Sequence, residues 1–163
     1  FFEFRCTLNK TLKEVLDQER GLLFKIPIQE SDSEYEAEVD FVNDPVNSLR
    51  YGFACSVGGD SPRGLGLFAK IAHFGKIYIA EYMLFSPNSV ARLMANDAIE
   101  YYIKNKNYEL AKSIKKRMKE VTTEKTIINT CWGCSYENIS MNEASLRAAE
   151  SKEYLYKNFI FAK

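Results

Sequence analysis

The stretch IEYYIKNKNYELAKSIKKRMKEV (99–121) has the pattern of two short helices joined by a break, and it decides much of the fold. Upstream of it, Ser86 can cap a helix, and Pro87 at the first helical position loses no hydrogen bond. The break falls at NKN (105–107). Apolar and aromatic residues recur every three or four positions on both sides of it: Val90, Met94, Ala98 and Tyr101 before, and Tyr108, Ala111, Ile114, Met118 and Val121 after. This spacing predicts an antiparallel helical hairpin over 86–121.

The first half of the chain is richer in strand signals. EYEAEVDF (34–41) alternates apolar residues with the acids Glu34, Glu36, Glu38 and Asp40, which predicts a half-buried antiparallel strand with one wet face. Further strands are predicted at 22–28, 51–57, 76–84 and 126–132, and further helices at 7–21, 67–74 and 140–156, the last opened by a Ser140–Glu143 capping box. GGDSPRGLG (58–66) is predicted to be a loop.

These elements predict an α+β fold. With 163 residues the chain has the size of a single domain, 1–163. We expect a small antiparallel sheet, formed by 22–85 and 126–132, to be packed by the first and last helices. The helical hairpin lies against this sheet or projects from it.

The charge balance argues against a dedicated nucleic-acid binder. Lys and Arg together number 22, as do Asp and Glu, so the net charge is zero, whereas phosphate contacts favour a strongly basic domain. The charges are nevertheless segregated along the sequence. Seven acidic residues and no basic residue lie between Lys25 and Arg50, whereas 104–125 contains eight basic and three acidic residues. Two patches of opposite sign predict a protein partner or self-association. The candidate partner-binding residues are Lys112, Lys115, Lys116 and Lys119 on the hairpin, and Glu34, Glu36, Glu38 and Asp40 on the acidic strand.

The cysteines of NTCWGCS (129–135) admit three interpretations. Cys131 and Cys134 are spaced like half of a zinc site, but only Cys6, Cys55 and His73 remain to complete it. A redox pair normally begins at a helix N-terminus, whereas this pair follows a strand. We favour buried, reduced structural cysteines, with zinc and redox chemistry as alternatives.

Other candidate sites have weaker patterns. The glycine loop 58–66 contains Arg63 and leads toward a helix, which permits an anion site, but it matches neither a P-loop nor a dinucleotide fingerprint. His73 is the only histidine, so any histidine-based catalysis depends on it. We interpret it as a packing residue, and we predict neither catalytic residues nor a cofactor.

Part of the hairpin resembles the UVR motif, a helical hairpin of nucleotide-excision-repair subunits and some bacterial stress regulators. The matching positions are Tyr108-Glu109, Ala111, Ile114-Lys115 and Met118, with Ile99 at an apolar position of the first helix. Tyr102 stands where the motif has a small residue, and Lys116 where it has an acid. The resemblance covers 99–121 and implies docking on partner helices rather than catalysis.

The function we predict is that of a non-enzymatic protein-binding or assembly protein, acting through the basic hairpin and the acidic strand face. One alternative is a small enzyme, or a zinc or redox protein, centred on Cys131, Cys134 and His73. A second is a nucleic-acid accessory protein. We expect a cytoplasmic location without a membrane span. The abundance of Lys, Asn, Ile, Tyr and Phe is consistent with a bacterial or phage accessory protein, including a virion-associated one.

Overall fold

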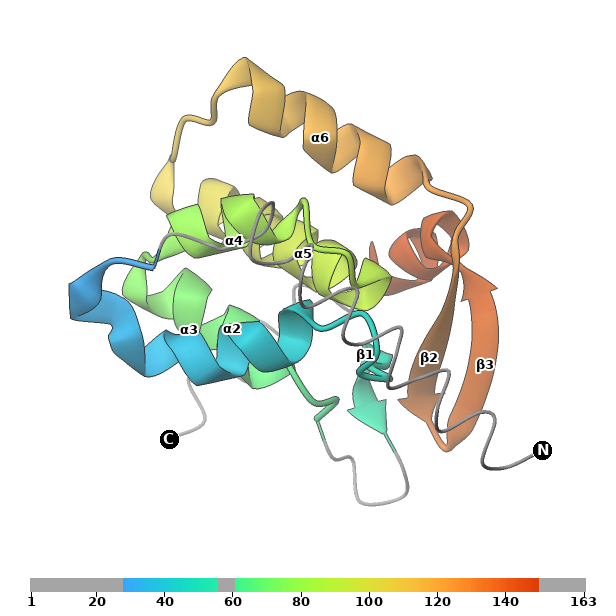
Figure 1. Cartoon of the computed structure of the whole chain (residues 1–163). Coiled ribbons are helices and arrows are strands. Elements are labelled where there is room, and N and C mark those ends of the chain that lie inside the picture. Colours follow the sequence, from blue (N-terminus) through green and yellow to red (C-terminus); the bar gives the residue numbers. More distant parts are fainter. Residues whose placement is uncertain (1–27, 56–60, 150–163) are drawn as a thin grey trace.

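The computed structural model describes residues 28–55 and 61–149 (Figure 1). The elements are η1 (Glu30–Tyr35), α2 (Glu36–Asn43), β1 (Tyr51–Cys55), α3 (Leu65–Phe74), α4 (Ile77–Met83), α5 (Ser89–Lys106), α6 (Lys112–Thr123), β2 (Ile127–Gly133) and β3 (Ser135–Ser140). Residues 141–149 are also helical. The predicted helix at 7–21, nearly all of the strand at 22–28 and the end of the last helix lie outside the described residues.

Helix α5 is the centre of the fold. From Val90 to Ile99 every residue except Arg92 is buried, because α5 packs against α3, α4, α6, β1 and β2. Asn88 caps the helix by accepting hydrogen bonds from two backbone N–H groups of its first turn. At the other end Asn107 adopts the left-handed conformation, with φ of 49°, so the predicted break at 105–107 is confirmed.

Helix α6 runs back over α5, as Figure 1 shows, and completes the predicted helical hairpin. It begins at Lys112, four residues later than the pattern indicated. The cap of α5 also differs from the expectation, since Asn88 rather than Ser86 is the capping residue and the helix begins at Ser89. Ser86 accepts a hydrogen bond from the Asn88 N–H at 3.1 Å and so supports the capping turn.

The sheet has three strands in the order β1-β2-β3. Strands β1 and β2 are parallel, so the expectation of a purely antiparallel sheet is wrong for this pair, whereas β2 and β3 form an antiparallel hairpin. The strand predicted at 126–132 is confirmed as β2, and it is followed by β3, for which the sequence pattern predicted no element. Helices pack on this small sheet, so the α+β class is confirmed. None of the helices within the described ranges is long and apolar enough to cross a membrane.

The strand predicted at 34–41 is wrong, because these residues form the end of η1 and helix α2. Tyr35, Val39 and Val42 are buried at i, i+4 and i+7, which is a helical stripe, whereas Ala37 is exposed. The alternating positions that predicted a strand include Tyr35 and Val39, which also belong to the helical stripe, so both patterns fitted these residues. Glu and Ala also favour a helix over a strand.

The strand predicted at 76–84 is also wrong, since these residues form helix α4. Ile77, Ile79, Ala80 and Met83 are all buried, and α4 packs between α3 and α5. A short apolar run buried on most sides does not show whether the backbone is a strand or a helix. The preceding helix does end as predicted, because Gly75 takes a left-handed φ of 70° after α3.

Candidate functional site

Helix α6 separates its charged residues from its apolar residues. Four lysines at positions i, i+3, i+4 and i+7 lie along one face, and all are exposed. We call them the basic stripe: Lys112, Lys115, Lys116 and Lys119. On the opposite face Ile114 and Met118 are half-buried and Val121 is buried against the core. The stripe therefore faces solvent over a length of about 10 Å.

Other ion pairs hold α6 in place. The Arg117 guanidinium donates to a backbone carbonyl just after α4 at 3.0 Å and pairs with Glu124 at 3.3 Å. Glu124 also pairs with Arg92 of α5 at 2.6 Å. These three side chains are largely shielded from water, so the network fixes the position of α6 without involving the stripe. Within the described residues, the stripe makes one ion pair, between Lys116 and Glu120 at 3.8 Å.

The acidic residues predicted on a strand face lie on η1 and α2 instead. All four are exposed, and we call them the acidic surface: Glu34, Glu36, Glu38 and Asp40. Helical spacing places Glu36 beside Asp40, whereas Glu38 faces α3 and pairs with Lys70 at 3.3 Å. Figure 1 shows α2 and α6 on opposite sides of the layer formed by α4 and α5. The two charged surfaces are therefore far apart on one molecule.

A buried charge cluster close to the acidic surface was not predicted from the sequence. Asp32 is buried, and its carboxylate accepts from Lys76 Nζ and from the Tyr78 hydroxyl, both at 2.6 Å. The hydrogen bond from Lys76, followed by that from Tyr78, lowers the pKa of Asp32 below its ordinary value of 3.8. The same carboxylate raises the pKa of Lys76. Asp32 thus joins η1 to the start of α4 and is not available to a partner.

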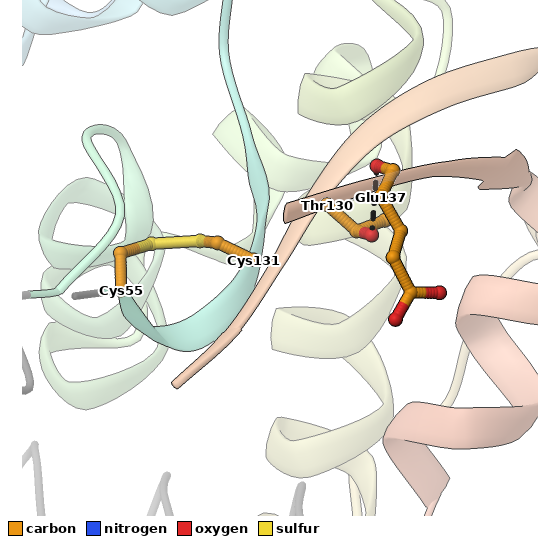
Figure 2. Close-up of a disulfide and its surroundings, with 4 residues drawn as sticks. All are labelled: Cys55, Thr130, Cys131 and Glu137. Carbon is orange, nitrogen blue, oxygen red and sulfur yellow. Dashed lines mark hydrogen bonds between the residues drawn. A yellow bond between two sulfur atoms is a disulfide. The ribbon is translucent and has the colours of Figure 1, made fainter. Parts of the chain in front are cut away.

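The cysteines do not match the expected reduced, buried set. Cys55 at the end of β1 and Cys131 in β2 form a disulfide, with Cα atoms 5.2 Å apart (Figure 2). Cys134 is a free, exposed thiol in the turn between β2 and β3. Figure 2 also shows the Thr130 hydroxyl donating to the Glu137 carbonyl across this hairpin, at 3.1 Å. The sequence grouped Cys131 with Cys134, but the pairing of β1 with β2 brings Cys131 to Cys55.

The residues proposed for metal or histidine chemistry form no metal or catalytic cluster within the described ranges. In the described part of the chain, no three His, Cys, Asp or Glu side chains are placed to hold a metal ion. Cys6, the remaining candidate ligand, lies outside that part. His73 is exposed in the last turn of α3. It lines neither of the two surface hollows beside Arg63.

Arg63 lies between these two hollows. One is a cleft of about 460 Å³ between α2 and α3, and the other is a hollow of about 270 Å³ beside the sheet. The glycine loop does lead into a helix, as its sequence indicated, because α3 begins directly after Gly64. The sequence did not single out Arg50 or Tyr136, which line the smaller hollow. Their proximity depends on strand pairing, and no local motif signals it.

Comparison with known proteins adds no assignment. No family model matches the chain, and no curated protein or solved structure is similar enough to count as a match. The resemblance of 99–121 to the UVR hairpin therefore stays a prediction. Tyr108 and Glu109, two of its positions, precede α6, while Ile114, Lys115 and Met118 lie within the helix.

Proposed function

We propose that the protein is a non-enzymatic assembly protein whose basic stripe on α6 binds an acidic protein surface. The observation that carries this proposal is the arrangement of α6, whose exposed lysines share one face while its position depends on the separate network of Arg92, Arg117 and Glu124. Four ammonium groups on one rigid helical face attract a complementary acidic surface and set the orientation of docking.

A second copy of the chain offers such a surface. Glu34, Glu36 and Asp40 are exposed on η1 and α2, and none of the three has an ion pair within the described residues. Because the stripe and the acidic surface lie on opposite sides of the molecule, their contact joins two different surfaces. A contact of this kind is head-to-tail, and it forms rings or open chains rather than only a symmetric dimer.

Sedimentation velocity at several protein concentrations tests the proposal. We expect species larger than a dimer at about 50 mM NaCl and their loss at about 500 mM, where the Debye length falls to a few ångströms. A protein that stays monomeric at every salt and protein concentration contradicts self-association. Assembly that is unchanged at high salt contradicts the electrostatic contact.

A charge-swap pair sharpens this test. The stripe variant K112E/K115E/K119E and the acidic-surface variant E34K/E36K/D40K should each be monomeric, because each carries two surfaces of the same sign. An equimolar mixture should assemble again, since each variant supplies the charge that the other has lost. If the mixture stays monomeric while circular dichroism shows both variants folded, the two surfaces do not bind each other.

A further inference from the structure

Two hollows that share Arg63 form a basic site on the side of the sheet that holds Cys55. The smaller, of about 270 Å³, contains two arginines and two serines; its lining is Ser48, Arg50, Cys55, Ser61, Pro62, Arg63 and Tyr136. The larger, of about 460 Å³, extends from Pro62 and Arg63 between α2 and α3. The charged side chains that line the smaller hollow are both arginines, and none of its lining residues is acidic.

Both arginines are positioned by aromatic rings. The guanidinium carbon of Arg63 lies 3.5 Å from the centre of the Phe41 ring, and that of Arg50 lies 4.9 Å from the centre of the Tyr136 ring. Such stacking occupies the flat face of a guanidinium and leaves the N–H donors at its edge available. The two side chains are thus oriented before any ligand binds.

Neither guanidinium has an acceptor within the described residues. In contrast, Arg92, Arg117 and Arg147 each pair with one or more glutamates. Both side chains are exposed, so their N–H donors are bonded to water and can exchange it for an anion. Among the arginines of the described ranges, Arg50 and Arg63 are therefore the two available to an anion.

The adjoining cleft can hold the organic part of a ligand. Its wall is mainly apolar and includes Phe41, Val42 and Leu67. Its two other charged residues, Glu38 and Lys70, neutralise each other in an ion pair of 3.3 Å. A basic hollow that adjoins an apolar cleft fits a molecule with a charged end and an apolar body.

We propose that Arg50 and Arg63 bind the phosphoryl group of a small phosphate monoester, with the hydroxyls of Ser48 and Ser61 as further donors. Two guanidinium edges and two hydroxyls suit the three terminal oxygens and near-double charge of a phosphate monoester. A carboxylate, with two oxygens and one charge, is satisfied by a single guanidinium. The apolar body of the ligand lies against Phe41 and Leu67. The site borders the acidic surface at Glu38, which lines the cleft, but it uses none of Glu34, Glu36 and Asp40 and no residue of α6.

Isothermal titration calorimetry with three probes tests the site at constant ionic strength: phenyl phosphate, inorganic phosphate and benzoate. We expect one phenyl phosphate per chain, weaker binding of inorganic phosphate because it lacks the apolar body, and still weaker binding of benzoate. No binding of either phosphate at millimolar concentration would falsify the proposal. Benzoate binding as tightly as phenyl phosphate would overturn the preference for a phosphoryl group.

Matched variants separate recognition from general charge. R50Q and R63Q should each weaken phenyl phosphate binding about tenfold or more, whereas K106Q, which removes one exposed charge at the end of α5, should change it less than about twofold. R50K keeps the charge but loses the planar fork, so it should also weaken binding several-fold. Equal losses in R50Q and K106Q, or full binding by R50K and R50Q, would show that the two-arginine site is not the binding site.

Discussion

Replacing Gly52 with alanine should unfold the sheet or bring it close to unfolding. Gly52 faces Cys131 in the neighbouring parallel strand and has a φ of 149°, which L-residues rarely adopt. A Cβ atom there would overlap the carbonyl oxygen of Cys131 and lie 3.3 Å from its Sγ atom. Because the obstacle is backbone, no side-chain rotation relieves the overlap, and β1 must move away from β2.

The cost follows from what this movement breaks. The unfavourable φ alone contributes about 1–3 kcal/mol. Separating the strands loses about 1 kcal/mol for each interstrand hydrogen bond, and partial exposure of Tyr51 and Phe53 adds about 1–2 kcal/mol. Both rings are now buried and lie within 6.1 Å of the Trp132 ring, measured between centroids. If about two interstrand hydrogen bonds are lost, the total of about 4–7 kcal/mol is comparable to the whole stability of a small domain.

Urea denaturation measured by Trp132 fluorescence checks this value, because Trp132 is the only tryptophan and contacts the affected rings. Gly66→Ala is the matched control. No atom lies within 4 Å of a Cβ built at Gly66, which is in the first turn of α3. The control should be unchanged or more stable by up to about 1 kcal/mol. If Gly52→Ala keeps wild-type stability, the close approach of β1 and β2 is not as described.

Three further changes test other parts of the fold. Reducing the Cys55–Cys131 disulfide, which spans 76 residues, should lower the free energy of unfolding by about 4.5 kcal/mol on the chain-entropy relation. Urea titrations with and without reductant measure this, and a loss below about 1 kcal/mol contradicts it. Asp32→Asn should destabilise the protein near neutral pH, where the carboxylate pairs with Lys76. Because the folded-state pKa of Asp32 is lowered, this stabilisation is present above its ordinary value of 3.8 and is lost as pH falls through the lowered pKa. The urea midpoints of wild type and Asp32→Asn should therefore converge in acid, and a constant difference would refute the assignment. Asn88→Ala should lower the free energy of unfolding by about 2 kcal/mol, because this side chain caps α5 and also donates hydrogen bonds to the 44–47 turn. Asn88→Asp should keep the stabilisation that comes from capping. Thermal unfolding compares the two variants, and equal melting temperatures for wild type and Asn88→Ala would contradict the cap.

The sequence was sufficient where a pattern was long and had marked ends. The helical hairpin extends over more than thirty positions and its break is set by Asn107, so α5 and α6 were predicted with errors only at their starts. Gly75 likewise identified the end of α3. In these cases local backbone preference and side-chain spacing agree, so tertiary contacts had nothing to override.

Prediction failed where two periodicities fitted the same residues. In 34–41 an alternating pattern and a helical stripe both include Tyr35 and Val39, and burial of Val42 decides for the helix. In 76–84 almost every apolar residue is buried, so periodicity carries no information.

The candidate site depended on contacts between distant segments. Arg50 and Arg63 line one hollow with Tyr136 because β1, β2 and β3 pair, and the same pairing joins Cys55 to Cys131.

The basic stripe should weaken α6 rather than stabilise it. Lys115 has Lys112 three positions before it and Lys119 four positions after it, and like charges at these spacings each cost about 0.2–0.5 kcal/mol. Lys115→Gln should therefore raise stability by about 0.5 kcal/mol while weakening self-association. Lys116→Gln should change stability less, because it also removes the ion pair with Glu120. Differential scanning calorimetry at low salt compares the two variants, and sedimentation velocity measures their assembly. Repulsion between the lysines of the basic stripe lowers the stability of α6, so binding, rather than folding, explains why they lie on one face. If Lys115→Gln instead destabilises the helix and leaves assembly intact, the lysines serve the fold and the assembly proposal loses its support.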